Sequence, residues 1–187
     1  RFGNCERTTF GDLEPGIQTG TCCDTGGGWS TAFMAHPSQL HPVPADLSDE
    51  AAVMVEPTAC AIHAVLRAAI PDGATVAVIG SGTLGLLTIA AIRAHAAPGT
   101  LIATGKYSAQ RALALALGAD TVVEPGELRR AVRRATGTLA ITTRSASSTG
   151  DCGGEIGRLT GGADIVIDCV GSEASIADAL AVVRPRG

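Results

Sequence analysis

A glycine-rich motif is the feature of this sequence with the clearest chemical meaning. It is a G-x-G-x-x-G pattern made of Gly80, Ser81, Gly82, Thr83, Leu84 and Gly85. Where such a turn opens a helix, the unpaired N–H groups of the first helical turn face an anion, and the helix dipole favours the negative charge. The motif therefore predicts that these six residues bind the pyrophosphate of a dinucleotide. The competing interpretation is a tight turn without a ligand.

The motif has this meaning only between a strand and a helix, and its flanking residues predict both. Residues 75–79 (TVAVI) are short, apolar and rich in β-branched side chains, which is typical of a central parallel strand. Residues 86–96 contain no helix breaker and predict a helix. In this context Gly80 permits a tight exit from the strand and Gly82 lets the backbone approach the pyrophosphate. Gly85 lets the helix pack close to the strand.

Three potential metal ligands form a second candidate site. If helical geometry extends from the helix predicted at residues 57–69 back to Glu56, then Glu56, Cys60 and His63 share one face, and all three side-chain types bind zinc. The competing interpretation is structural: an acidic residue near a helix start stabilises the dipole, and the other two side chains fill the interior. The residue types alone favour the structural interpretation.

Composition limits the classes of function. The 187 residues carry a net charge of −4 without a basic excess, so we expect neither a nucleic-acid nor a membrane partner. The six cysteines include no C-x-x-C pair and do not form a disulfide framework, which predicts a reducing, cytoplasmic location. Because the chain begins with Arg1 rather than Met and stops at a turn-like RPRG, we expect a fragment cut at both ends.

Strands and helices alternate along the chain after residue 75. Further strands are predicted at residues 100–104, 121–123 and 164–169, and further helices at 108–117, 126–135 and 172–183. This alternation predicts an α/β fold with a parallel, doubly wound sheet of the Rossmann type. Residues 137–154 are polar and aperiodic, which predicts a flexible loop.

Several stretches together resemble the medium-chain, zinc-dependent alcohol and polyol dehydrogenases. They are GGGWSTAF at 26–33, LHPVPADLSDEAAVMVEP at 40–57, VAVIGSGTLGLL at 76–87, LGAD at 117–120 and DIVIDCVGS at 164–172. Their order and spacing are more specific than any single motif, and they run along most of the chain.

The resemblance implies two parts. Residues 1–57 correspond to the end of the first segment of a GroES-like, β-rich catalytic domain, and residues 58–187 to a partial NAD(P)-binding Rossmann domain. Glu56 matches the position at which polyol-type members place a ligand of the catalytic zinc, whereas Cys60 and His63 keep structural roles. The family's other catalytic residues have no counterpart in the chain, so the fragment by itself is expected to be inactive.

The residues at the ends of two predicted strands bear on the cofactor. NAD-binding Rossmann domains usually place an acidic residue at the end of the second strand to hold the ribose 2′-OH. Here Gly105 stands near that position and Lys106 follows, which favours NADP because a cation accommodates the 2′-phosphate. After the strand at residues 164–169, Val170 and Gly171 are expected to line the cofactor cleft.

The resemblance thus implies a zinc-dependent oxidoreductase that transfers a hydride between an alcohol or carbonyl substrate and NADP or NAD. A homo-oligomer is possible for the full-length protein. Two alternatives remain open: a nucleotide-binding module without catalysis, and a methyltransferase, which also binds a nucleoside cofactor at a glycine-rich turn. The dehydrogenase motifs before residue 58 count against a methyltransferase.

Overall fold

The computed structural model describes residues 28–33, 40–142 and 157–185, and the chain divides into two units, Arg1–Ala52 and Val53–Gly187. In the first unit the described residues contain one helix, α1 (Asp49–Ala52), preceded by Ser48. The Ser48 hydroxyl accepts a hydrogen bond from the N–H of Ala51 at 3.3 Å, as expected of an N-cap. Much of the predicted GroES-like segment lies outside the described residues, and the predicted boundary after residue 57 stays a prediction.

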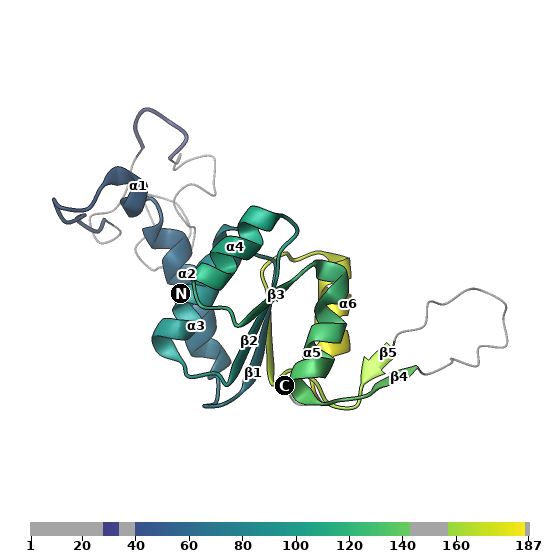
Figure 1. Cartoon of the computed structure of the whole chain (residues 1–187). Helices are drawn as coiled ribbons and strands as arrows, with labels where there is room; N and C mark the ends of the chain where they lie inside the picture. Colours follow the sequence, from purple (N-terminus) through teal and green to yellow (C-terminus); the bar gives the residue numbers. More distant parts are fainter. Residues whose placement is uncertain (1–27, 34–39, 143–156, 186–187) are drawn as a thin grey trace, which may run out of the picture. The chain divides into compact units, whose positions relative to one another are not determined.

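The second unit is built on a parallel four-stranded sheet with the order β3-β2-β1-β6 (Figure 1). Its strands are β1 (Thr75–Ile79), β2 (Thr100–Thr104), β3 (Thr121–Val123) and β6 (Ile165–Asp168). Parallel strands whose connections contain helices form the doubly wound architecture. The predicted α/β fold of Rossmann type is therefore confirmed.

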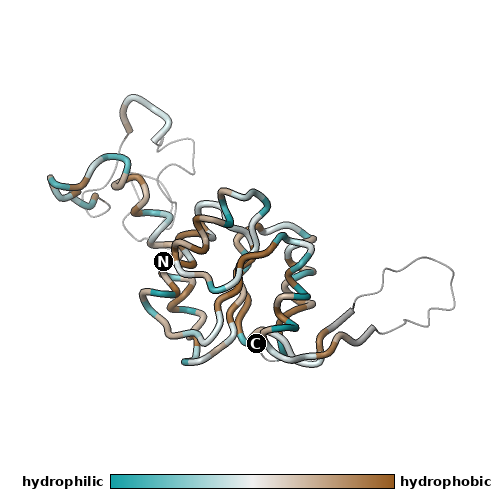
Figure 2. Tube along the Cα trace, viewed as in Figure 1, coloured by the Kyte–Doolittle hydropathy of each residue, from teal (hydrophilic) through white to brown (hydrophobic). Residues whose placement is uncertain are grey.

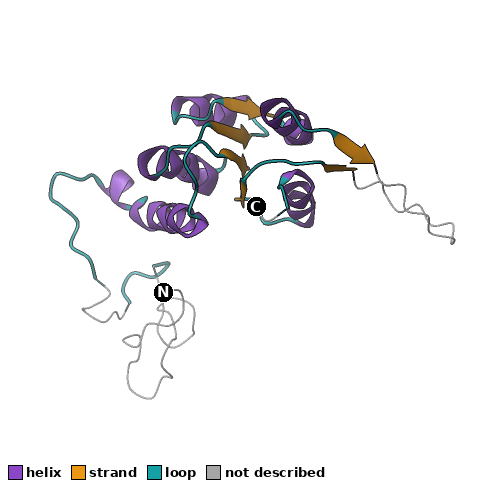
Figure 3. Cartoon of the chain, turned by 90° about the horizontal axis from the view of Figure 1, so that it is seen from below, coloured by secondary structure: helices purple, strands orange, loops and turns teal. Residues whose placement is uncertain are grey.

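Helices cover both faces of this sheet, which gives the three layers seen in Figures 1 and 3. One face carries α2 (Val55–Ala68), α3 (Thr83–His95) and α4 (Ser108–Ala116). The other carries α5 (Leu128–Thr136), which follows the 3₁₀ turn η2 (Pro125–Glu127), and α6 (Glu173–Val182). The predicted helices are thus present, with small shifts at their ends.

The central strand β1 shows why the sheet must be covered on both faces. Val76 and Val78 belong to the core under α2, α3 and α4, whereas Ala77 and Ile79 belong to the core under α5 and α6. Alternate side chains of a strand point to opposite faces, so a strand buried on both sides is apolar at every position. Figure 2 shows the hydrophobic strands between the two helical layers.

Helix α3 begins at Thr83, three residues before the predicted start at residue 86. Gly82 is the N-cap and has an extended backbone (φ −78°, ψ −169°), after which the chain becomes helical at once. The second half of the glycine motif is therefore the first turn of the helix. This brings the N–H groups of that turn directly to the turn that follows β1.

The predicted loop at residues 137–154 contains a strand. Strand β4 (Ala140–Thr142) pairs antiparallel with strand β5 (Gly157–Leu159). The loop prediction is therefore wrong at residues 140–142. The pairing is anchored by Leu159, which is buried in the core beneath α5 and α6. A contact of this kind is not visible in a local hydropathy pattern. Residues 143–156 lie outside the described residues.

Residues 49–68 form one stretch that is long and apolar enough to cross a membrane by length and composition, among the residues that the structure describes. Such a stretch does not by itself identify a membrane segment, because core helices satisfy the same test. Within α2, Ala61 and Val65 are buried in the core of the second unit. The expectation of no membrane partner stays a prediction.

Candidate functional site

The glycine turn is held against the end of β2 by two hydrogen bonds to one residue. The N–H of Gly80 donates to Thr104 Oγ1 at 2.9 Å, and the Ser81 hydroxyl donates to the Thr104 carbonyl oxygen at 2.7 Å. Ser81 and Thr104 are both buried. Thr104 therefore positions the turn, a role that sequence reasoning did not assign. A threonine at the end of a buried strand beside a glycine turn was the only available signal.

Two glycines of the motif are required by the space around them. A Cβ on Gly85 would lie 1.8 Å from the carbonyl oxygen of Gly80, so the first turn of α3 approaches the chain leaving β1 closely. Gly80 has a φ of +90°, and a Cβ there would lie 2.5 Å from Cγ2 of Val170. Residues other than glycine rarely adopt that φ. The predicted tight exit and close helix packing are thus present in the structure.

The third glycine faces open space. A Cβ on Gly82 would meet no atom within 4 Å. Gly82, Thr83 and Leu84 are all exposed. No side chain caps this end of α3. The first-turn N–H groups lack partners within the helix, so an anion placed beside Gly82 would receive their hydrogen bonds. The chain's own geometry fits a pyrophosphate at this point.

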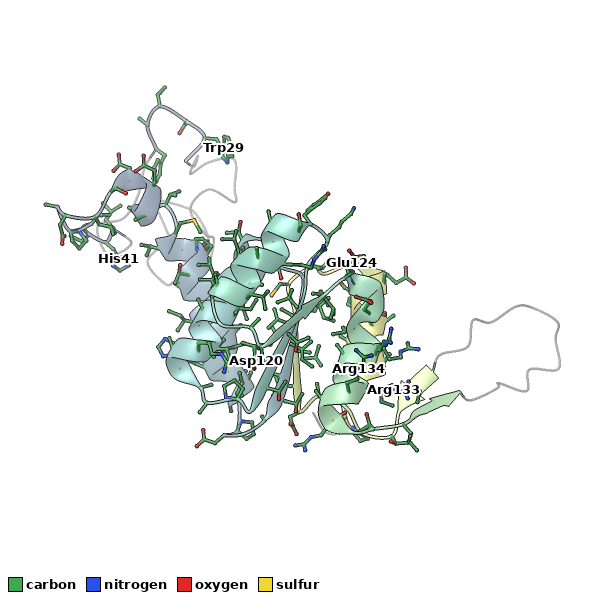
Figure 4. The ribbon with its side chains drawn as sticks, in the orientation of Figure 1. Trp29, His41, Asp120, Glu124, Arg133 and Arg134 are labelled. Atoms are coloured by element: carbon green, nitrogen blue, oxygen red, sulfur yellow. The ribbon has the colours of Figure 1, made fainter. Side chains whose placement is uncertain are left out.

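The end of β2 presents cations rather than a carboxylate. Gly105 is buried, and Lys106, the only lysine in the sequence, is exposed with its Nζ 5.6 Å from the ring centroid of Tyr107. Arg111 Nη1 donates to the carbonyl oxygens of Gly105 and Lys106 at 3.0 and 3.1 Å. It also pairs with Glu124, directly after β3, at 3.3 Å (Figure 4). Arg111 thus braces this loop through two backbone carbonyls, while the Lys106 side chain is exposed.

The end of β6 is a turn organised by Asp168. Its Oδ1 accepts hydrogen bonds from the N–H groups of Val170 and Gly171 at 2.9 and 3.3 Å, and its Oδ2 accepts one from the Ser175 hydroxyl at 2.8 Å. Asp168 therefore has a structural role, and Val170 is placed over Gly80. Beside them, burial raises the pKa of the Cys169 thiol, an effect partly opposed by its hydrogen bond with Thr88.

The predicted metal-binding face of α2 is only partly assembled by the described residues. Glu56 is exposed in the first turn, and the Cys60 thiol donates a hydrogen bond to its Oε1 at 3.3 Å. That hydrogen bond raises the pKa of Cys60. His63 is exposed. Within the described ranges no group of three or more metal-binding side chains converges, so Glu56 contributes at most one ligand of a larger set.

Comparison with known proteins places this arrangement in a family. Residues 83–187, more than half of the chain, match the sequence profile of the zinc-binding dehydrogenases. The chain belongs to the zinc-binding dehydrogenase family. The predicted resemblance to medium-chain, zinc-dependent alcohol and polyol dehydrogenases is confirmed, and the methyltransferase alternative is excluded.

One curated relative matches nearly the whole chain. The sorbitol dehydrogenase of Halalkalibacterium halodurans is 28% identical over 190 residues, which span 99% of this chain and 48% of that protein. The chain therefore spans about half the length of this curated relative.

Two solved structures support the same assignment. The apo form of zinc-dependent alcohol dehydrogenase 2 from Streptococcus pneumonia matches with a TM-score of 0.59 and 28% identity, over 79% of this chain and 36% of that one. A protein described as a zinc-binding dehydrogenase from Sinorhizobium meliloti 1021, solved with NADP bound, matches with a TM-score of 0.56 and 29% identity, over 78% and 37% of the two chains. A nicotinamide cofactor and zinc are thus the expectation for the family.

Proposed function

We propose that this protein transfers a hydride between an alcohol or carbonyl substrate and NADP, and that the second unit binds the cofactor. The observation that carries the proposal is the glycine turn. Gly85 packs against Gly80, Gly82 is open, and an uncapped helix start faces the same space. Because the chain belongs to a dehydrogenase family, we interpret this geometry as the binding site for the pyrophosphate of the cofactor.

The cofactor would lie along the carboxyl ends of the strands, where ligands bind in open α/β sheets. The pyrophosphate would sit beside residues 80–85. The turn at Val170 and Gly171 would contact the cofactor on the β6 side. Val170 is suited to this because it is exposed, while the Asp168 carboxylate holds the N–H groups of both residues.

NADP is favoured over NAD by the charges at the end of β2. Gly105 offers no carboxylate for a ribose 2′-OH, and Lys106 is positioned to meet a 2′-phosphate. The Glu124 carboxylate lies nearby and would oppose that phosphate, but its pairing with Arg111 offsets part of its charge. A relative with NADP bound supports the same choice.

Zinc would be bound in part by Glu56, whose carboxylate is exposed and competent as a ligand. When bound, the metal supplies Lewis-acid polarisation of the substrate oxygen. The Cys60 thiol, with its raised pKa, is protonated at neutral pH and donates to Glu56. Cys60 would therefore orient the Glu56 carboxylate rather than bind zinc itself.

The single lysine allows a direct test of the nucleotide site. Amine-selective acylation, followed by proteolysis and mass spectrometry, reports on Lys106 through its own peptide, because Lys106 is the single lysine among these 187 residues. We expect 2′,5′-ADP to protect Lys106 from acylation and ADP to protect it much less. Equal protection by the two nucleotides would show that no 2′-phosphate contacts Lys106.

Two substitutions separate the pyrophosphate from the 2′-phosphate. Gly82→Ala places a methyl group in the space proposed for the pyrophosphate, and it should weaken NADPH and NADH binding alike, by about tenfold or more. Lys106→Ala should weaken only NADPH binding, by about tenfold. Clearly tighter binding of NADH than of NADPH by the wild-type protein would overturn the preference for NADP.

The zinc ligand and the enzyme class can be tested together. Glu56→Ala in the intact protein should lower both bound zinc, measured by metal analysis, and turnover with alcohols, while nucleotide affinity stays unchanged. Unchanged zinc and turnover would remove Glu56 from the site. Tight nucleotide binding without turnover on any alcohol or carbonyl would favour the alternative, a nucleotide-binding module. The cytoplasmic location and a homo-oligomeric state remain part of this proposal.

A further inference from the structure

A cavity of about 440 Å³ lies between α5 and the β2–β3 side of the sheet, away from the proposed cofactor site. Its apolar lining includes Ile102, Val123 and Ala131. Ile102 belongs to the core on the α5 and α6 face, whereas the glycine turn opens α3 on the opposite face. The volume falls in the range of small-molecule sites. The proposed function does not use this cavity.

Two arginines of α5 line the cavity, and neither has a protein partner within the described part of the chain. In the described ranges, Arg130 and Arg134 form no hydrogen bond or ion pair. By contrast, Arg93, Arg111 and Arg184 are each paired with a carboxylate, at 2.8, 3.3 and 2.6 Å respectively. Arg67 and Arg129 also form no hydrogen bond or ion pair within the described residues, so Arg130 and Arg134 differ from them by lining the cavity.

The spacing of these arginines makes a counter-ion favourable. Arg130 and Arg134 are four residues apart on one helix and therefore project from the same side of α5. Like charges at this spacing destabilise a helix. An anion between the guanidinium groups removes this repulsion and accepts their hydrogen bonds.

The rest of the lining limits the kind of anion. Thr100 and Thr121 place hydroxyl-bearing residues at the starts of β2 and β3, where they can donate further hydrogen bonds. Glu127 lines the cavity at the start of α5, at the other end of the helix from Arg134. Its carboxylate would repel a second negative charge on the ligand there. A ligand with one anionic end and a short uncharged body satisfies these conditions.

We propose that this cavity binds a small organic oxyanion, a carboxylate or phosphate monoester, as a ligand separate from the nicotinamide cofactor. Arg130 and Arg134 bind the oxyanion as paired forks, the geometry for which arginine is suited. The body of the ligand contacts Ile102, Val123 and Ala131. The site recognises the charged end and the apolar body together.

The test uses butyl phosphate, butyrate and inorganic phosphate as probes, titrated into the intact protein by calorimetry at constant ionic strength and a saturating NADPH concentration. Butyl phosphate or butyrate should bind saturably. Inorganic phosphate should bind at least about tenfold more weakly than butyl phosphate, because it lacks the apolar body. Binding that competes with NADPH would place the probe in the cofactor site and overturn the proposal.

A pair of matched double variants tests the role of the arginines. Arg130→Gln with Arg134→Gln should weaken the binding of the organic probe by about tenfold or more. Arg129→Gln with Arg133→Gln removes the same charge from the same helix, at positions that do not line the cavity, and should change the affinity by less than about threefold. Circular dichroism verifies that both variants are folded. Equal weakening in the two variants would show that only the general charge of α5 attracts anions, and would overturn the proposal.

Discussion

The glycine turn and the predicted metal-binding face of α2 are two candidate sites in the same unit, and they differ in how completely this chain builds them. The turn is assembled by the backbone of β1 and α3, with Thr104 holding it from β2. On α2, Glu56 has only the Cys60 thiol as a partner in the described part of the chain. A site made of backbone geometry is contained in one segment, whereas a metal site requires side chains from several.

The two regions should therefore respond differently to substitution. Changes at the turn alter packing and should affect stability and nucleotide binding together. Changes at Glu56 should leave the fold intact and affect only the metal.

The largest effect is expected for Gly85→Ala. Its Cβ would lie 1.8 Å from the Gly80 carbonyl oxygen, so α3 must shift away from β1. Overpacking of this kind should lower the free energy of unfolding by about 3 kcal/mol. Urea denaturation measures it, with Gly126→Ala as control, where a Cβ meets nothing within 4 Å and the change should stay within about 0.5 kcal/mol. Equal stabilities of the two variants would contradict the close approach.

A smaller loss is expected for Thr104→Val. The substitution keeps the shape but leaves the partly buried N–H of Gly80 without its acceptor, which should cost about 1–3 kcal/mol. Thr88→Val is the control, because the Thr88 hydroxyl bonds the Leu84 carbonyl oxygen and the Cys169 thiol, so its removal leaves no backbone N–H unpaired. If both variants lose the same stability in thermal unfolding, Thr104 does not anchor the turn.

The pH dependence of stability should reveal Cys169, which lies beside the turn. Burial raises the pKa of this thiol in the folded state, so the folded protein holds the thiol proton more tightly than the unfolded chain. Its stabilising contribution is complete below the pKa of the unfolded thiol and is lost as the pH rises through the folded pKa. Unfolding free energies measured from pH 7 to 10 should therefore decline more steeply for the wild type than for Cys169→Ala. Parallel curves would contradict a buried, protonated thiol.

The smallest effect on stability is expected for Glu56→Gln. The side chain is exposed, so the free energy of unfolding should change by no more than about 0.5 kcal/mol. Chemical denaturation in the presence of a chelator measures the stability of the metal-free protein. A loss as large as that of Thr104→Val would show that Glu56 is integrated into the fold and would remove the contrast between the two regions.

The sequence predicted the sheet and the turn well because both are encoded locally. The strands at 75–79, 100–104 and 121–123 have the observed bounds, and an apolar run between turn residues is sufficient to identify a buried strand. The pairing of residues 140–142 with 157–159 was missed because it depends on the burial of Leu159, a long-range contact.

The cofactor edge was predicted in part. Lys106 and the absence of an acid at Gly105 are visible in the sequence. Arg111 donates to the backbone carbonyl of Gly105 and pairs with Glu124. Both contacts depend on the position of β3 beside β2. These contacts decide how much negative charge opposes a 2′-phosphate.

The sequence by itself determined the four strands of the parallel sheet with the helices between them, the glycine turn and the family, because each depends on residues that are neighbours along the chain. Only the tertiary structure decided that Thr104 locks the turn, that Asp168 holds the β6 turn, and that Glu56 meets Cys60 but no third ligand among the described residues. The physical reason is that hydrogen bonds and packing between distant segments form only when the sheet brings those segments together.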